Sequence, residues 1–216
     1  MNFLAHYYFD HQVGKPEYNL GLIFPDILRN FVPRTRLSLT VDVPRETKEH
    51  ALLQGCIQHV DSDKVFHAWQ GFHDLMEMVT KKIRTSKYPI GRDWFVSHIL
   101  VELIMDYYLL QKNPNLATML YTDFALVDTK VIDSFLACNE FSNFERFHHG
   151  YDHFMKLRYL ESYAESGSIV FALGKICTKM KLEPFSEQQK ALLQSIIEDI
   201  YEVLQPYMEA LDVELK

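Results

Sequence analysis

Residues 94–110 read WFVSHILVELIMDYYLL, an almost unbroken apolar run. A helix that is apolar on every side is expected to be buried. Apart from tyrosines, the only ionisable side chains in the run are His98, Glu102 and Asp106, and their spacing of four residues places them on one helix face. A buried charge is costly unless it is paired or bound to a metal. The run therefore predicts a core helix with a polar site on it.

An upstream segment repeats this arrangement with His59, Asp63 and His67, again four residues apart. These three continue a stripe that begins with Leu52 and Cys56, so they occupy positions where core residues are expected. Two helices that each present three candidate ligands are the main functional signal in this sequence.

Helical periodicity dominates the remaining chain, and alternating strand patterns are almost absent. The fold is therefore expected to be all-α, a single-domain multi-helix bundle that covers residues 1–216. Pro25 is expected to bend a helix over 16–30, and residues 33–44 are expected to form a loop. The other expected helices cover about 2–10, from about 45 through His67, 72–84, 94–110, one opened by Pro114, 142–163, 166–181 and 186–213.

Composition is that of a globular protein, with 48% hydrophobic and 24% charged residues. The opening MNFLAHYYFD lacks the basic region and long apolar stretch of a signal peptide. Cys56, Cys138 and Cys177 are far apart and odd in number, which is typical of reduced, buried cysteines. A cytoplasmic location without a membrane span is expected, because three ionisable groups interrupt the 94–110 run.

The net charge is −7, yet residues 81–92 (KKIRTSKYPIGR) hold five bases and no acid. Such a patch can attract an anionic ligand or an acidic partner, or be an ordinary solvated loop. Nucleic acid is not expected as a partner.

Imidazole and carboxylate groups are ligands for Zn²⁺, Mn²⁺ or Fe²⁺, while the lack of paired cysteines excludes a thiolate site. Two ligands four residues apart on a helix can reach one ion, whereas a third at eight residues drifts by about 80° and serves a neighbouring ion better. We therefore expect two ions about 4 Å apart, as in two-metal phosphoesterases.

Two further candidate ligands come from the start of the chain, namely His6 on a short apolar helix and Asp26 after an apolar run. The competing interpretation of His6 is a hydrogen-bonded core residue. For Glu102 and Asp106 it is a buried ion pair with Arg or Lys. His50, His73, His148, His149 and His153 are expected at the surface or beside the site, and Trp69 and Trp94 are expected to pack in the core.

With these residues in view, the chain resembles the acyl carrier protein phosphodiesterase family, helical enzymes distantly similar to HD-domain metal hydrolases. MNFLAH is similar to the start of that family, and PDILRNF resembles its G-N-x-x-x-D-F element at Asp26. GCIQHVDSD resembles G-x-x-x-H-x-x-x-D at Gly55, His59 and Asp63. VELIMDYYL resembles the D-x-x-x-D-H-F-L helix, and LRYLESYAESGSIVFALGKI resembles a C-terminal W-L-x-x-Y…G-I…L pattern.

The chain departs from that family at several ligand positions. It has His67 where the family has a second aspartate, Glu102 in place of Asp, Tyr107 in place of His, and Leu22 in place of Asn. His98 has no counterpart there. The resulting order H-x-x-x-D…H…H-x-x-x-E is similar to the ligand order of zinc-dependent phospholipase C and P1-type nucleases.

The residues and the resemblance together suggest a metal-dependent phosphodiesterase whose substrate is a phosphodiester, in particular a phosphopantetheinylated acyl carrier protein. Asp63 or Asp26 would accept the proton of the attacking water. Two alternatives stay open, a di-iron helical oxidase and a degenerate family member that binds an acidic partner without catalysis. The expected metal ligands are His6, Asp26, His59, Asp63, His67, His98, Glu102 and Asp106.

Overall fold

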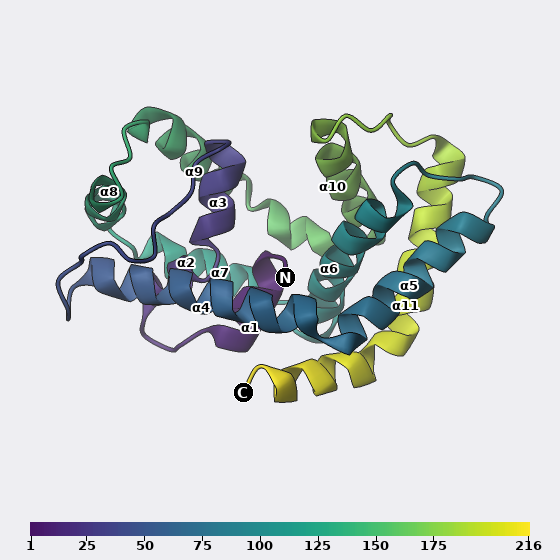
Figure 1. Ribbon diagram of the computed structural model, residues 1–216, viewed down its shortest axis with the longest axis horizontal. Coiled ribbons are helices and arrows are strands. Elements are labelled where there is room, and N and C mark those ends of the chain that lie inside the picture. Colours follow the sequence, from purple (N-terminus) through teal and green to yellow (C-terminus); the bar gives the residue numbers. More distant parts are fainter. The chain divides into compact units, whose positions relative to one another are not determined.

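The computed structural model describes residues 1–216 and contains eleven α-helices, one 3₁₀ helix and no strand, which confirms the all-α expectation. The likeness to HD-domain proteins stays a prediction. In chain order the elements are α1 (Phe3–Asp10), α2 (Pro16–Gly21), α3 (Phe24–Phe31), α4 (Lys48–Ala68), α5 (Gln70–Thr85), α6 (Asp93–Lys112), α7 (Leu116–Ala125), α8 (Thr129–Cys138), α9 (Phe144–Leu157), η1 (Tyr159–Ala164), α10 (Ser166–Lys179) and α11 (Glu187–Glu214) (Figure 1).

These helices form two compact units that interleave along the chain. The first unit contains Met1–Asn2, Lys64–Pro114 and Ser162–Lys216, and the second contains Phe3–Asp63 and Asn115–Glu161. Helix α4 supplies its residues up to Asp63 to the second unit and its last turn to the first. The single-domain organisation expected from the sequence stays a prediction.

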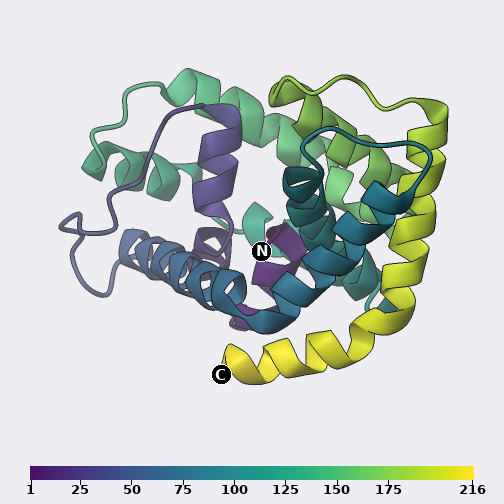
Figure 2. The same cartoon turned by 45° about the vertical axis from the view of Figure 1, so that its right-hand side comes forward.

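In the first unit, α6 packs against α5 and α10, and α11 packs against α5, α6 and α10. Helix α11 starts with a capping box, in which Ser186 and Gln189 satisfy each other's backbone N–H groups. It contains Pro206 and bends along its length (Figure 2). Most of the apolar residues of α6 are buried, as its sequence predicts, with Trp94 as an exposed exception.

In the second unit, α1 and α2 pack against α7, and α3 packs against α9. Helices α2 and α4 approach each other at Gly21 and Gly55. A Cβ on Gly55 would lie 2.1 Å from the Tyr18 carbonyl oxygen, and a Cβ on Gly21 would lie 2.3 Å from that of Leu52. Only residues without a side chain permit this crossing. The crossing brings Leu22, at the end of α2, next to the candidate site residue His59 of α4.

Two helix predictions were wrong. The expected helix over 16–30 is two helices, α2 and α3, because Pro25 cannot donate a backbone hydrogen bond and is instead accommodated in the first turn of α3. The expected helix over 142–163 ends at Leu157, where Arg158 adopts a left-handed backbone (φ 48°), and a 3₁₀ helix follows. Helix α8 was not separately expected, and its last residue, Cys138, is exposed, so the expectation of three buried cysteines holds only for Cys56 and Cys177.

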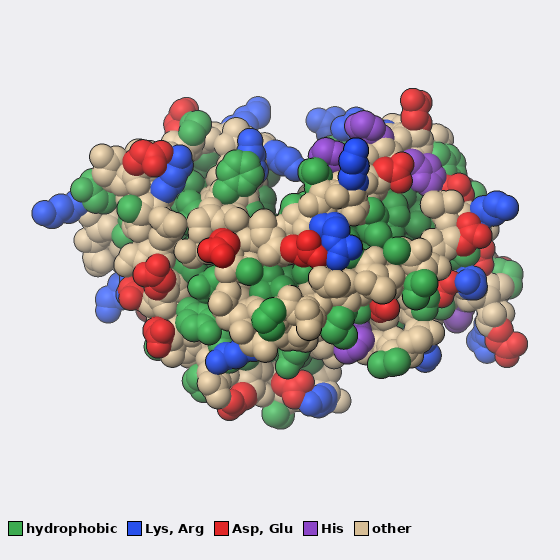
Figure 3. Space-filling model, turned by 180° about the vertical axis from the view of Figure 1, so that it is seen from behind, with side chains coloured by type: hydrophobic (Ala, Val, Ile, Leu, Met, Phe, Trp, Pro, Cys, Tyr) green, Lys and Arg blue, Asp and Glu red, His purple; other side chains and the backbone are tan.

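No helix is both long and apolar enough to cross a membrane. On the face shown in Figure 3, acidic and basic side chains are interspersed, with apolar patches between them. Among the expected loops, residues 33–44 contain no helix.

Candidate metal centres

Six of the eight expected ligands lie in two separate groups. His6, His59 and Asp63 form one group in the second unit, and His67, His98 and Glu102 form the other in the first unit. Within each group, the candidate ligand atoms all lie within 4.8 Å of one another. We call them the buried group and the open group, because their side-chain exposures differ as described below.

The buried group joins helix α1 to helix α4. His6 Nε2 lies 3.1 Å from Asp63 Oδ1, and His59 Nε2 lies 3.7 Å from Asp63 Oδ2. The two imidazole rings stack at a centroid distance of 4.1 Å. Asp26, in the first turn of α3, places Oδ1 4.0 Å from His59 Nε2. Asp26 therefore offers a fourth potential ligand, a carboxylate oxygen, close to the group.

A backbone carbonyl orients His59. Its Nδ1 lies 2.8 Å from the Leu22 carbonyl oxygen. A carbonyl can only accept, so Nδ1 carries a hydrogen and Nε2 faces Asp63 and Asp26. Metal-binding histidines are oriented in this way by their second nitrogen. The close approach at Gly55, one helical turn before His59, puts the end of α2 within reach.

His6 is fully buried, yet neither of its ring nitrogens makes a hydrogen bond of acceptable geometry, even at the 3.1 Å approach to Asp63. Burial, and next the adjacent His59 ring, lower the pKa of His6 to about 3. The imidazole is therefore neutral near pH 7, which is the form that binds metals. Buried polar atoms without partners are rare and call for an explanation.

Asp63 stays ionised in this setting. Burial opposes its negative charge, but the contact with His6 outweighs that effect and holds the pKa of Asp63 below its usual range. The buried group thus offers one carboxylate and two imidazoles, a donor set that suits zinc, manganese or iron.

The open group joins the last turn of α4 to α6. Both His67 Nε2, at 3.2 Å, and His98 Nε2, at 3.1 Å, point at the same oxygen, Oε1 of Glu102. The two rings lie 5.1 Å apart and nearly parallel. Phe72, buried at the start of α5, contacts both rings edge-on and holds them in place.

Glu102 is the one carboxylate of the open group. Burial opposes its ionisation, but the amino group of Met1, 3.8 Å away, and the hydrogen bonds of the two histidines hold its pKa below the usual range. No Lys or Arg side chain pairs with it. The buried Lys or Arg ion pair considered as an alternative for Glu102 is therefore not present.

Asp106 belongs to neither group. It is fully buried one turn after Glu102, and the Asn2 side-chain amide donates a 2.7 Å hydrogen bond to its Oδ2. Its role as a metal ligand stays a prediction, as does the 4 Å spacing of two ions.

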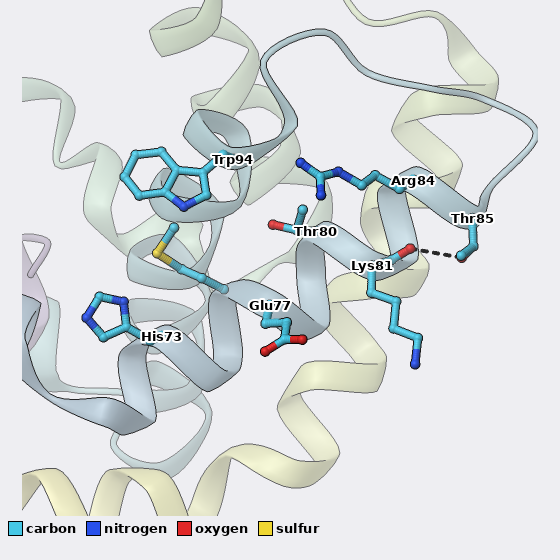
Figure 4. A pocket seen from close by; sticks show the side chains of 8 residues that line it. His73, Glu77, Thr80, Lys81, Arg84, Thr85 and Trp94 are labelled. Atoms are coloured by element: carbon cyan, nitrogen blue, oxygen red, sulfur yellow. Dashed lines mark hydrogen bonds between the residues drawn. The ribbon is translucent and has the colours of Figure 1, made fainter.

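One expectation about the surroundings was wrong. Trp94 does not pack in the core, because 61% of its surface is exposed. Its indole contacts the His98 ring at 5.8 Å and lines a cavity of about 470 Å³ beside α5 (Figure 4). Sequence reasoning missed this residue. A signal was present, since Trp94 stands in the first turn of α6, directly after the basic 81–92 segment.

The other histidines lie outside both groups. His149 and His153 are exposed on α9, and His148 Nε2 pairs with Asp133 at 2.6 Å. His73 is exposed, as expected, and lines the cavity beside Trp94.

No protein-family model, no curated protein and no solved structure matches this chain.

Proposed function

We propose that this protein is a metal-dependent phosphodiesterase that binds divalent ions through its two His–His–carboxylate groups. The observation that carries this proposal is the buried group, in which His6 Nδ1 has no hydrogen-bond partner and the Nε2 atoms of His6 and His59 lie 3.1 and 3.7 Å from the Asp63 carboxylate. Without a ligand this arrangement lowers the stability of the fold, because an unpaired buried polar group costs about 1–3 kcal/mol.

The donor set supports Zn²⁺, Mn²⁺ or Fe²⁺. Four imidazoles and two carboxylates favour zinc, while a larger carboxylate share, if Asp26 also binds, favours manganese or iron. A bound ion of this kind supplies two effects, a lowered pKa of bound water and neutralisation of charge on phosphoryl oxygens.

The chain's own residues supply the remaining steps. Asp63 and Asp26 both lie within 4.0 Å of His59 Nε2, so either carboxylate is placed to accept a proton from a water molecule held there. The hydrogen bond from His59 to the Leu22 carbonyl keeps this ring from rotating out of position. In the open group, Glu102 keeps two imidazoles converged on one point.

The phosphodiester class rests on the resemblance to acyl carrier protein phosphodiesterases and on the basic 81–92 segment. Five basic side chains without an acidic one can attract a phosphorylated substrate or an acidic carrier protein. Within this proposal, a phosphopantetheinylated carrier protein is the first natural substrate to assay.

The test begins with elemental analysis of protein purified without chelator, followed by hydrolysis of bis-p-nitrophenyl phosphate with the metal that is found. Replacement of Asp63 by Ala removes the only carboxylate of the buried group. We expect at least about a 100-fold loss of activity and loss of metal from that group, with an unchanged helical circular dichroism spectrum.

The matched control is His153→Ala, which removes an exposed imidazole outside both groups. It should leave metal content and activity unchanged. Full metal content and activity in Asp63→Ala would overturn the ligand assignment. Oxo-bridged iron in the purified protein would favour the oxidase alternative, and absence of any metal would favour the non-catalytic one.

A further inference from the structure

We propose that the cavity lined by Trp94 and Arg84 binds the aromatic ring of a phosphate-bearing ligand, specifically the base of a nucleotide, next to the open group. The binding of the aromatic ring is inferred from the cavity alone, whereas the position of the phosphate rests on the proposed binding of a metal by the open group. This inference thus names a substrate class for the proposed phosphodiesterase.

The cavity has the size and shape for such a ring. Its volume of about 470 Å³ falls within the range of small-molecule sites. It is lined by residues of α5 and by Trp94 of α6, among them Met76, Glu77, Thr80 and Arg84. Figure 4 shows the indole of Trp94 and the guanidinium of Arg84 on opposite sides of the space over Thr80.

Trp94 presents an exposed aromatic ring on which a ligand ring can stack. An indole is rarely left with 61% of its surface in water, and the aromatic contact that Trp94 makes is with His98. Base–aromatic stacking is a common use of such an exposed ring.

Arg84 supplies the facing surface. Its Nε and Nη2 atoms donate to Asp93, which fixes the guanidinium plane. Nη1 is left for a ligand, and guanidinium planes also stack on aromatic rings. Lys81 also lines the cavity, but its ammonium group points away from the Trp94 indole (Figure 4) and adds to the positive field of the 81–92 segment.

The open group does not line the cavity but adjoins it through His98, which contacts Trp94. His98 follows Trp94 by one helical turn on α6, and their ring centroids are 5.8 Å apart. A ligand whose ring stacks on Trp94 therefore brings the adjoining phosphate towards His98 and its partners His67 and Glu102.

Binding is measured with metal-loaded full-length protein that carries Trp69→Phe, so that Trp94 is the only tryptophan. The probes are AMP and ribose 5-phosphate, which differ only by the base. We expect AMP to quench the Trp94 fluorescence and to bind about tenfold more tightly than ribose 5-phosphate. Equal affinity for the two probes would overturn the inference.

Two substitutions at position 94 check that the indole is responsible. In calorimetry, Trp94→Leu should weaken AMP binding about tenfold and leave ribose 5-phosphate unaffected, while Trp94→Phe should recover most of the affinity because it retains a ring. Undiminished AMP binding by a folded Trp94→Leu variant would contradict the proposal.

A third measurement separates this inference from the proposed function. His67→Ala, which leaves the contact between His98 and Trp94 in place, should weaken AMP binding but leave binding of adenosine, which has no phosphate, unchanged. If the protein binds AMP through Trp94 but holds no metal and hydrolyses no phosphodiester, the phosphodiesterase proposal fails and the ring site stands. If hydrolysis is found without any preference for a base, the phosphodiesterase stands and the ring site fails.

Discussion

The buried group and the open group use the same chemistry in different surroundings. In the buried group the histidine side chains are 0% and 4% exposed, whereas in the open group they are 37% and 26% exposed. The buried group has a backbone carbonyl that orients His59 and a nearby second carboxylate, Asp26. The open group has instead an exposed indole and a cavity beside it.

This contrast suggests a division of labour. A site enclosed by helices holds an ion tightly and releases it slowly, because helices must separate before the ion leaves. A site with exposed ligands and a cavity exchanges its ion more easily and is accessible to substrate. The comparison therefore predicts tight binding of an ion in the buried group and access of substrate to the open group.

The largest expected effect concerns metal retention. Upon dialysis against a chelator, the open group should lose its ion first, and the buried group only upon longer treatment or partial unfolding. In Glu102→Ala only the slowly released ion should remain, and in His59→Ala only the quickly released one, each variant binding the lost ion at least about 100-fold more weakly.

Time-resolved metal analysis of the dialysed protein gives both release phases. The exposed-histidine variant His149→Ala serves as the control and should show both. A single release rate that neither Glu102→Ala nor His59→Ala alters would contradict the division of labour.

The next effect concerns the helix crossing that supports only the buried group. Gly55→Ala would place a Cβ 2.1 Å from the Tyr18 carbonyl oxygen, so α2 and α4 must separate and the Leu22 carbonyl must withdraw from His59. We expect the free energy of unfolding to fall by about 1–3 kcal/mol, as for other overpacked sites. Urea denaturation measures this change.

Gly91→Ala is the matched control, because a Cβ there meets no atom within 4 Å. It should leave stability almost unchanged. The Gly55→Ala variant should also lose the slowly released ion while it retains the quickly released one. An equally stable Gly55→Ala protein would show that the crossing is not tight.

The smallest effect is a pH dependence of the stability of metal-free protein. Burial lowers the pKa of His6 from 6.5 to about 3 in the folded state. Between these values the unfolded chain binds a proton that the folded chain does not. Stability therefore falls as the pH drops from 6.5 towards 3, by at most about 1.4 kcal/mol per pH unit from this residue.

His6→Leu should reduce this pH dependence in denaturation curves recorded across the same range, because it removes the group that gains a proton on unfolding. His67→Leu, in the open group, serves as the comparison. A wild-type stability that stays constant over this range would contradict a buried, neutral His6.

Much of the helical structure follows from local patterns. The apolar run around His98 and Glu102 predicts α6 to within two residues at either end, and the stripe through Cys56 and His59 predicts most of α4. These predictions hold because a 3.6-residue period is a local property of the chain. The break between α2 and α3 was missed, since Pro25 is compatible with either a bent helix or a new first turn.

The candidate ligands also follow from the sequence, because ionisable residues on apolar helix faces are recognisable from spacing alone. Six of the eight lie in groups with metal-binding geometry. The exposure of Trp94, by contrast, was wrongly predicted, because an aromatic residue at the start of an apolar helix packs or not according to which helices lie beside it.

The amino-acid order alone was thus sufficient for the all-α class, the position of α6 and the selection of imidazoles and acids as candidate ligands, whose role in metal binding stays a prediction. Folding in three dimensions set the grouping of these ligands: His59 with His6 of α1, and His67 with His98 of α6. The orienting carbonyl of Leu22 and the exposed indole of Trp94 likewise depend on helix packing. The physical reason is that side-chain spacing is local, whereas burial and partner choice depend on segments far apart in the chain.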